Sequence, residues 1–68
     1  MEIKFPVLTG LIAQRDVRKT RIADAIGISA RAFYNKMNGL TSFTWEEVCM
    51  IQTQFFPDIT KDELFRKG

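Results

Sequence analysis

The sequence predicts a single all-α domain that spans residues 1–68. Two threonines are each followed three residues later by a glutamate, a pattern typical of helix N-termini because both side chains can cap free backbone amides there. Apolar residues recur at i, i+3 and i+4 rather than in alternation, which favours helices over strands. A hydrophobic fraction of 46% in 68 residues is enough for one compact core. We therefore expect five short helices around that core.

The first predicted helix begins at Pro6 and ends near Arg15. Proline is favoured in the first turn of a helix because the amide that it lacks has no partner there in any case. Leu8, Leu11 and Ile12 follow at a spacing that places them on one helical face. This face is expected to enter the core.

The next two predicted helices, residues 19–26 and 30–38, are separated by a tight turn. Gly27 suits the left-handed conformation that ends a helix, and Ser29 is a favourable N-cap for the next one. Gly39 stops the second of these helices. Two short amphipathic helices joined in this way have the sequence outline of a helix-turn-helix, whose second helix is shaped to enter the major groove of DNA.

The last two helices are predicted from their capping boxes. Thr44 and Glu47 open the fourth helix, which a later proline prevents from continuing. Thr60 and Glu63 repeat the device and open a short fifth helix that ends at about Arg66. Both helices therefore have well-defined starts.

The predicted core takes residues from four of the five helices. Trp45 is placed on the apolar face of the fourth helix. Phe55 and Phe56 are about 100° apart on a helix and cannot both face the core, so one of them, with the fifth helix, is available for a dimer surface. The expected core consists of Leu8, Leu11, Ile22, Ile26, Phe33, Val48, Ile51 and Phe55.

Composition excludes several classes of site. One cysteine cannot form an intramolecular disulfide, and the absence of histidine excludes a Cys/His zinc site, so we expect no metal and no cofactor. No apolar run approaches the ~18 residues of a membrane helix. Residues 1–5 lack the basic start and apolar stretch of a signal peptide. These features predict a cytoplasmic protein with no membrane contact, and no small-molecule ligand is evident.

The net charge of +2 is unevenly distributed. Residues 15–36 contain six basic and two acidic residues, a net charge of +4. Residues 44–68 contain three basic and five acidic residues, a net charge of −2. The basic excess lies on the predicted helix-turn-helix, as a surface that binds a polyanion requires. A solvated surface of mixed charge is the alternative interpretation.

Residues 8–65 resemble the Cro/phage-repressor (XRE-like) helix-turn-helix family. The resemblance implies a compact five-helix, lambda-repressor-like fold and a Cro-like transcription regulator or repressor that binds double-stranded DNA as a homodimer. It rests on an ordered set of residues with family-like spacing: Leu8, Leu11, Ile22, Ala23, Ile26, Gly27, Ile28, Ser29, Phe33, Asn38, Gly39, Trp45, Val48, Ile51 and residues 62–65.

Two pairs of residues depart from the family pattern. Arg18 and Lys19 stand where the family usually has a threonine cap followed by a glutamine that bonds a phosphate. Lys19 can take over the phosphate contact as a point charge, but the second helix loses its cap. A helix-1 arginine and a helix-3 glutamate, paired in many members, are replaced here by Ile12 and Met37, which predicts an apolar contact instead.

The resemblance implies base contacts from one face of the helix predicted at 30–38 and from its cap. Arginine can fork onto guanine, and asparagine can pair bidentately with adenine. The implied base contacts are Ser29, Ala30, Arg31, Tyr34 and Asn35. The implied phosphate contacts are Lys19, Asn38, Thr41 and Ser42, to which charge alone adds Arg18, Arg21 and Lys36.

Several of these residues have simpler interpretations. Arg31 and Asn35 can be solvated helix residues, and Asn38 can be only a helix terminator. Lys36 occupies a position that is usually apolar in the family. Either its stem runs along the rim of the core, or the helix is rotated and buries Tyr34 more deeply.

The favoured function is a sequence-specific DNA-binding transcriptional regulator of phage or mobile-element type, with residues 30–38 in the major groove. The alternative is a protein-interaction module on the same fold, such as an antitoxin-like partner or an inhibitor of another regulator. Acidic residues that neutralised the basic surface around Arg18, Lys19 and Arg31 would favour the alternative. No enzyme is expected, because the sequence shows no convergent acid–base groups and no phosphate loop.

Overall fold

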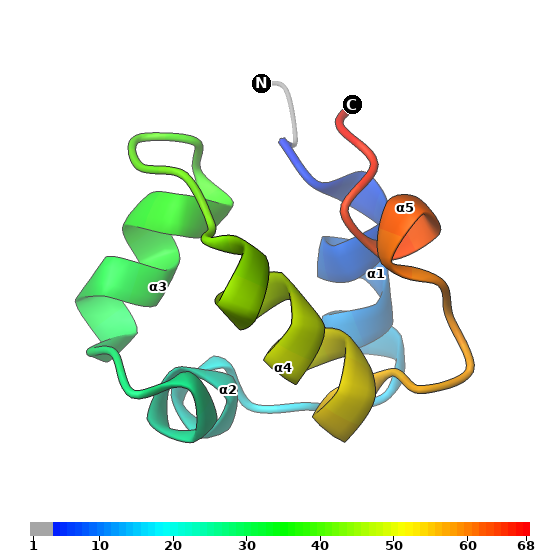
Figure 1. Cartoon of the computed structure of the whole chain (residues 1–68), viewed down its shortest axis with the longest axis horizontal. Helices are drawn as coiled ribbons and strands as arrows, with labels where there is room; N and C mark the ends of the chain where they lie inside the picture. The colour runs from blue at the N-terminus through cyan, green and yellow to red at the C-terminus, as the bar shows by residue number, and fades with distance from the viewer. Residues whose placement is uncertain (1–3) are drawn as a thin grey trace.

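A computed structural model describes residues 4–68, and this part of the chain folds into five helices with no strand (Figure 1). The prediction of an all-α architecture is confirmed. The helices are α1 (Pro6–Gln14), α2 (Lys19–Ile26), α3 (Ala30–Met37), α4 (Trp45–Phe55) and α5 (Lys61–Leu64). No helix within residues 4–68 is both long and apolar enough to cross a membrane.

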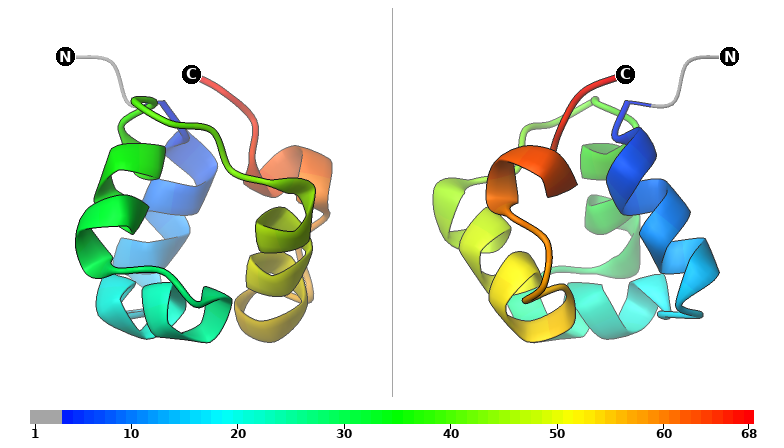
Figure 2. Two further views of the ribbon diagram at one scale, coloured as in Figure 1. Left: turned by 60° about the vertical axis from the view of Figure 1, so that its left-hand side comes forward. Right: turned by 90° about the vertical axis from the view of Figure 1, so that its right-hand side faces the viewer.

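The helices form a compact bundle in which α2 lies across one end (Figure 2). α2 packs against both α3 and α4, while α5 packs against α4 and α1. The first and last residues that the structure describes, Lys4 and Gly68, are hydrogen-bonded to each other, and the chain after α5 runs to the opposite end of the bundle from α2 (Figure 1). α3 therefore stands at one side of the molecule, and one of its faces is left open to solvent.

The core is built from all five helices and from residues just outside them. Five of the predicted core residues are buried, but Leu11, Val48 and Phe55 are only partly buried, and of these Leu11 and Phe55 pack against the core. The fully buried residues with the largest side chains are Phe33, Phe56, Leu8, Ile22, Ile51 and Leu64.

Phe56, rather than Phe55, fills the core at the end of α4. The prediction assumed that both residues are helical, but Phe56 is the C-cap, with φ −137° and ψ 56°. Leaving the helical conformation turns the Phe56 ring inward, and its exposed fraction falls to 0%. The expectation of Phe55 in the buried core was therefore wrong, because helical geometry ends one residue earlier.

Trp45 also differs from the prediction. It is the first residue of α4 and is 69% exposed, not part of the apolar face. On a helix it lies about 120° from the fully buried Ile51, whereas Glu47 lies only about 40° from it. The core-facing side of α4 consequently includes a glutamate and excludes the tryptophan.

The predicted helix ends are largely confirmed. Gly27 takes the left-handed conformation at the end of α2, with φ 77°. The Ser29 hydroxyl accepts a hydrogen bond from the Ala32 amide and caps α3. Both hydrogen bonds of the capping box that starts α4 are present. The second box is incomplete, because the Thr60 hydroxyl accepts from the Glu63 amide but the reciprocal bond to the Glu63 carboxylate is not formed. α5 also ends at Leu64 instead of near Arg66.

Candidate nucleic-acid interface

The open face of α3 carries most of the side chains predicted to contact bases. Phe33 and Met37 are buried on the opposite face, so α3 has a fixed rotation about its axis. This rotation brings together, around one shallow open hollow, the residues Ala30, Arg31, Tyr34, Asn35 and Asn38. Asn38 is also the C-cap of α3, as its interpretation as a helix terminator expects, and its phosphate contact stays a prediction.

Tyr34 belongs to this open face and not to the core, because 53% of it is exposed. The ammonium of Lys19 lies 4.8 Å from the centre of the Tyr34 ring, which is a cation–π distance. The contact joins the first residue of α2 to the middle of α3. It thereby places a cation beside the hollow on α3, at an uncapped helix start that has no acidic residue in its first turn.

Lys36 has a different role from the phosphate contact suggested by its charge. Its ammonium donates a hydrogen bond to the Ser42 carbonyl at 2.8 Å and lies 3.2 Å from Oε1 of Glu47. Only 14% of the Lys36 side chain is exposed. The stem runs at the rim of the core, which is the first of the two predicted alternatives. The ammonium ties α3 to α4, so we leave Lys36 out of the candidate interface.

Glu47 is the partner that the sequence analysis did not identify for Lys36. One of its carboxylate oxygens also accepts a hydrogen bond from the Thr44 amide at 2.8 Å. Burial by itself would raise the pKa of Glu47, but the Thr44 amide and Lys36 together outweigh it and hold the pKa below its ordinary value. The capping box predicted the Thr44 contact, whereas no local pattern connects Glu47 to Lys36.

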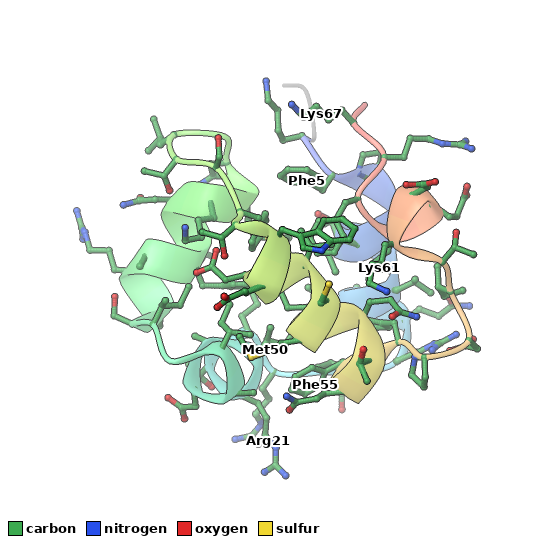
Figure 3. All side chains as sticks on the ribbon, in the orientation of Figure 1. Phe5, Arg21, Met50, Phe55, Lys61 and Lys67 are labelled. Atoms are coloured by element: carbon green, nitrogen blue, oxygen red, sulfur yellow. The ribbon has the colours of Figure 1, made fainter. Side chains whose placement is uncertain are left out.

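The acidic residues between positions 44 and 68 neutralise only some of the cations between positions 15 and 36. Arg15 pairs with Asp58 through two hydrogen bonds of 2.9 and 2.7 Å. Within residues 4–68, the other salt bridges are Lys36–Glu47 and Arg66–Glu63. Of the six basic residues between positions 15 and 36, four take part in none of the three: Arg18, Lys19, Arg21 and Arg31. Figure 3 shows Arg21 projecting outward from α2.

The remaining predicted contacts lie at the ends of α3. Ser29 is exposed, but its hydroxyl is already engaged in capping. Thr41 and Ser42 are exposed in the loop between α3 and α4, where the Ser42 carbonyl accepts from Lys36. Ile12 and Met37, which stand in place of the ion pair found in many family members, are both buried in the hydrophobic core.

Comparison with known proteins gives no match to a family model, a curated protein or a solved structure. The resemblance to phage repressors therefore remains a prediction, and function has to be argued from the surface itself. Within the described residues, no group of three Asp, Glu, Cys or His side chains could hold a metal ion. The surface offers cations, amides and one aromatic ring, which are groups that bind polyanions and base edges.

Proposed function

We propose that the chain is a sequence-specific DNA-binding transcriptional regulator of phage or mobile-element type. α2, the turn at residues 27–29 and α3 form its helix-turn-helix, in a lambda-repressor-like fold. The observation that carries the proposal is the set of four cations on and beside α2 and α3 that make no salt bridge within residues 4–68. The three acidic residues that form salt bridges, Glu47, Asp58 and Glu63, pair with other cations.

The proposed roles divide between base edges and phosphates. Arg31 lies in the first turn of α3, where a long side chain reaches a base edge and its fork matches guanine. Asn35 lies one turn later on the same face and matches adenine. Ala30, Tyr34 and Ser29 complete the base-facing set. Phosphate contact falls to Arg18, Lys19, Arg21, Asn38, Thr41 and Ser42.

Two features of Lys19 suit it to phosphate contact in this proposal. Its ammonium is held over the Tyr34 ring, so it does not have to be ordered when DNA binds. It also stands at the start of α2, where unpaired backbone amides attract a phosphate. A phosphate placed there would bind the helix start and the lysine together.

We further propose that two copies bind one partly palindromic site. A single eight-residue recognition helix offers few base contacts, and a symmetric dimer places two such helices about one helical turn of DNA apart. Titration of a selected DNA site should show two protomers that bind cooperatively. One tightly bound protomer on a non-palindromic site would contradict dimeric recognition.

The second candidate function is a protein-interaction module, and exposed apolar side chains favour it. Leu40 is 74% exposed and Trp45 is 69% exposed, and large apolar side chains of this kind are common at protein interfaces. Selection of bound sequences from a random pool of double-stranded DNA distinguishes the two candidate functions. A recovered consensus supports the regulator, whereas binding without sequence enrichment, or no binding at low salt, supports the interaction module.

A further inference from the structure

A second hollow lies at the end of the molecule where the two chain ends meet. Its lining comes from four places in the sequence: the residues before α1, the turn after α3, the start of α4 and the residues after α5. It encloses about 230 Å³. An apolar cavity of roughly 150 Å³ can hold benzene, so this hollow is large enough for one aromatic ring with a short substituent.

Three phenylalanine rings form part of the walls. Phe5, Phe43 and Phe65 meet edge to face, with ring centres 5.2 to 5.9 Å apart. All three rings line the hollow, together with Val48. Edge-to-face packing is the arrangement that aromatic pairs prefer, and such a group can accept a further ring in the same geometry. The walls therefore suit a flat apolar ligand group.

The charged side chains that line the hollow are both basic. They are Lys4, which precedes α1, and Lys67, which follows α5, and none of the acidic side chains within residues 4–68 lines the hollow. The stem of Lys4 passes the turn at Gly39, where an added Cβ would lie 2.8 Å from its Cε carbon. Neither lysine forms a salt bridge within residues 4–68. The hydroxyl residues Thr41 and Ser42 also line the hollow and can donate hydrogen bonds to an anion.

We propose that this hollow, which we call the terminal pocket, binds a small aromatic carboxylate. The ring lies against the three phenylalanines, and the carboxylate meets Lys4, Lys67 and the two hydroxyl residues. Aromatic walls and cationic residues in one small concavity match a ligand that has an apolar body and one anionic end. This site does not include the open face of α3, although it shares Thr41 and Ser42 with the proposed phosphate contacts, and its test uses no DNA.

The test is a titration of the full 68-residue chain, labelled with 15N, with sodium phenylacetate at constant ionic strength. We expect saturable amide shifts at Gly39, Thr41 and Ser42, with a dissociation constant on the order of 1 mM, as befits a ligand of few atoms. Benzyl alcohol, which keeps the ring without the charge, should bind several-fold more weakly. Sodium acetate, which keeps the charge without the ring, should not saturate.

Matched variants assign the binding to the terminal pocket. Changing both Lys4→Met and Lys67→Met keeps the aliphatic stems and should weaken phenylacetate binding by about five- to tenfold, the range for two exposed charge contacts. The control is Lys61→Met on α5, which should leave binding unchanged. Val48→Phe should fill the pocket and abolish binding, and if that variant does not fold, the lysine variants still decide.

Several results would overturn the proposal. These are no saturable shift up to 10 mM phenylacetate (roughly ten times the expected constant), equal binding of benzyl alcohol, or an equal loss in Lys61→Met. Shifts confined to the region of Trp45 and Lys61 would place the ligand elsewhere. Inorganic phosphate binding as tightly as phenylacetate would identify a simple anion site, such as one for a nucleic-acid phosphate, in place of a pocket that requires an aromatic ring.

Discussion

The first half of the molecule (α1 to α3) and the second half (α4, α5 and the residues around them) differ in how their charged residues are paired. In the second half, Glu47, Asp58 and Glu63 are each engaged in a salt bridge. Two of these carboxylates reach back to the first half, where they pair with Arg15 and Lys36. The comparison teaches that the basic excess of residues 15–36 is not one uniform surface, because folding removes two of its six cations from the candidate interface.

The two halves also stabilise their helices differently. α4 and α5 begin with threonine caps and have acidic residues in the first turn, where the helix dipole favours negative charge. α2 has neither and starts instead with Lys19, a cation at the positive end of the dipole. α2 is held by the buried side chains of Ile22, Ala23 and Ile26. Under the proposed function, a DNA phosphate at this end would supply the missing negative charge.

The largest expected effect is on stability, at the residue that joins the two halves. Phe33 on α3 is fully buried, and its ring packs 6.0 Å from that of Phe43, which precedes α4. Phe33→Ala should lower the free energy of unfolding by about 3–5 kcal/mol and largely unfold so small a domain. Phe55→Ala, which truncates a partly buried ring, should cost at most about half as much. Thermal and urea unfolding compare the two, and a melting temperature within a few degrees of wild type for Phe33→Ala would contradict the packing of α3.

The second effect is on recognition of DNA by the first half. Arg31→Ala should weaken binding to a selected site by about 1–3 kcal/mol and relax preference at one base position in each half-site. The matched control is Arg66→Ala, because Arg66 pairs with Glu63 beside α5 in the second half. Binding to a panel of single-base variants measures both changes. A loss from Arg31→Ala that is equal for every sequence would remove Arg31 as a base reader.

A smaller effect should come from Lys19. Lys19→Ala should weaken binding to all sequences alike and reduce the slope of log affinity against log salt by about one unit. Lys61→Ala on α5 serves as control and should leave the slope unchanged. Tyr34→Leu removes the ring beneath the Lys19 ammonium, and it tests whether that contact positions Lys19 for a DNA phosphate. Unchanged DNA binding in both Lys19→Ala and Arg31→Ala would favour the protein-interaction module.

The smallest effect concerns the salt bridge that joins the halves at the surface. The hydrogen-bonded Arg15 guanidinium is the main cause that lowers the pKa of Asp58 to about 2 from its ordinary 3.8. Since the folded pKa is lowered, the stabilising contribution is present above pH 4 or so and is lost as the pH falls toward 2. Asp58→Asn should reduce the fall in the free energy of unfolding between about pH 4 and pH 2. Glu46→Gln is the control, and the readout is urea unfolding at several pH values between 2 and 6.

Asp58→Asn also tests the charge comparison directly. It releases Arg15, which would then add one cation to those near α2. The affinity for DNA of random sequence should rise slightly, and the rise should vanish at high salt because the contact is electrostatic. A fall in affinity would contradict the idea that the acidic half limits the basic surface.

The sequence predicts local features well because their causes are local. A threonine or serine cap, a glycine in the left-handed conformation and apolar residues four apart act over one or two turns, and the end of α2 and the starts of α3 and α4 follow from them. The rotation of α3 follows in the same way, because Phe33 and Met37 are its apolar stripe. That rotation is enough to gather five of the predicted contact residues around one hollow.

The features that the sequence did not predict depend on distant parts of the chain. Arg15 and Asp58 are 43 positions apart, and Lys36 and Glu47 belong to different helices. Phe56 enters the core because the backbone leaves the helix at that residue, which a constant 100° per residue cannot represent. The terminal pocket is likewise assembled from both ends of the chain and from the turn between α3 and α4.

The contact between Lys4, the first described residue, and Gly68 has a consequence for how the fold can be connected to other sequences. The amide of Gly68 donates a hydrogen bond to the Lys4 carbonyl at 3.1 Å, and both residues lie on the opposite side of the bundle from α2. A domain with adjoining ends can be placed within a surface loop of a host protein, or closed into a ring by a short linker, without stretching its helices. New ends opened in the exposed turn at Pro57 and Asp58 would then give a circular permutant that keeps α2 and α3 intact.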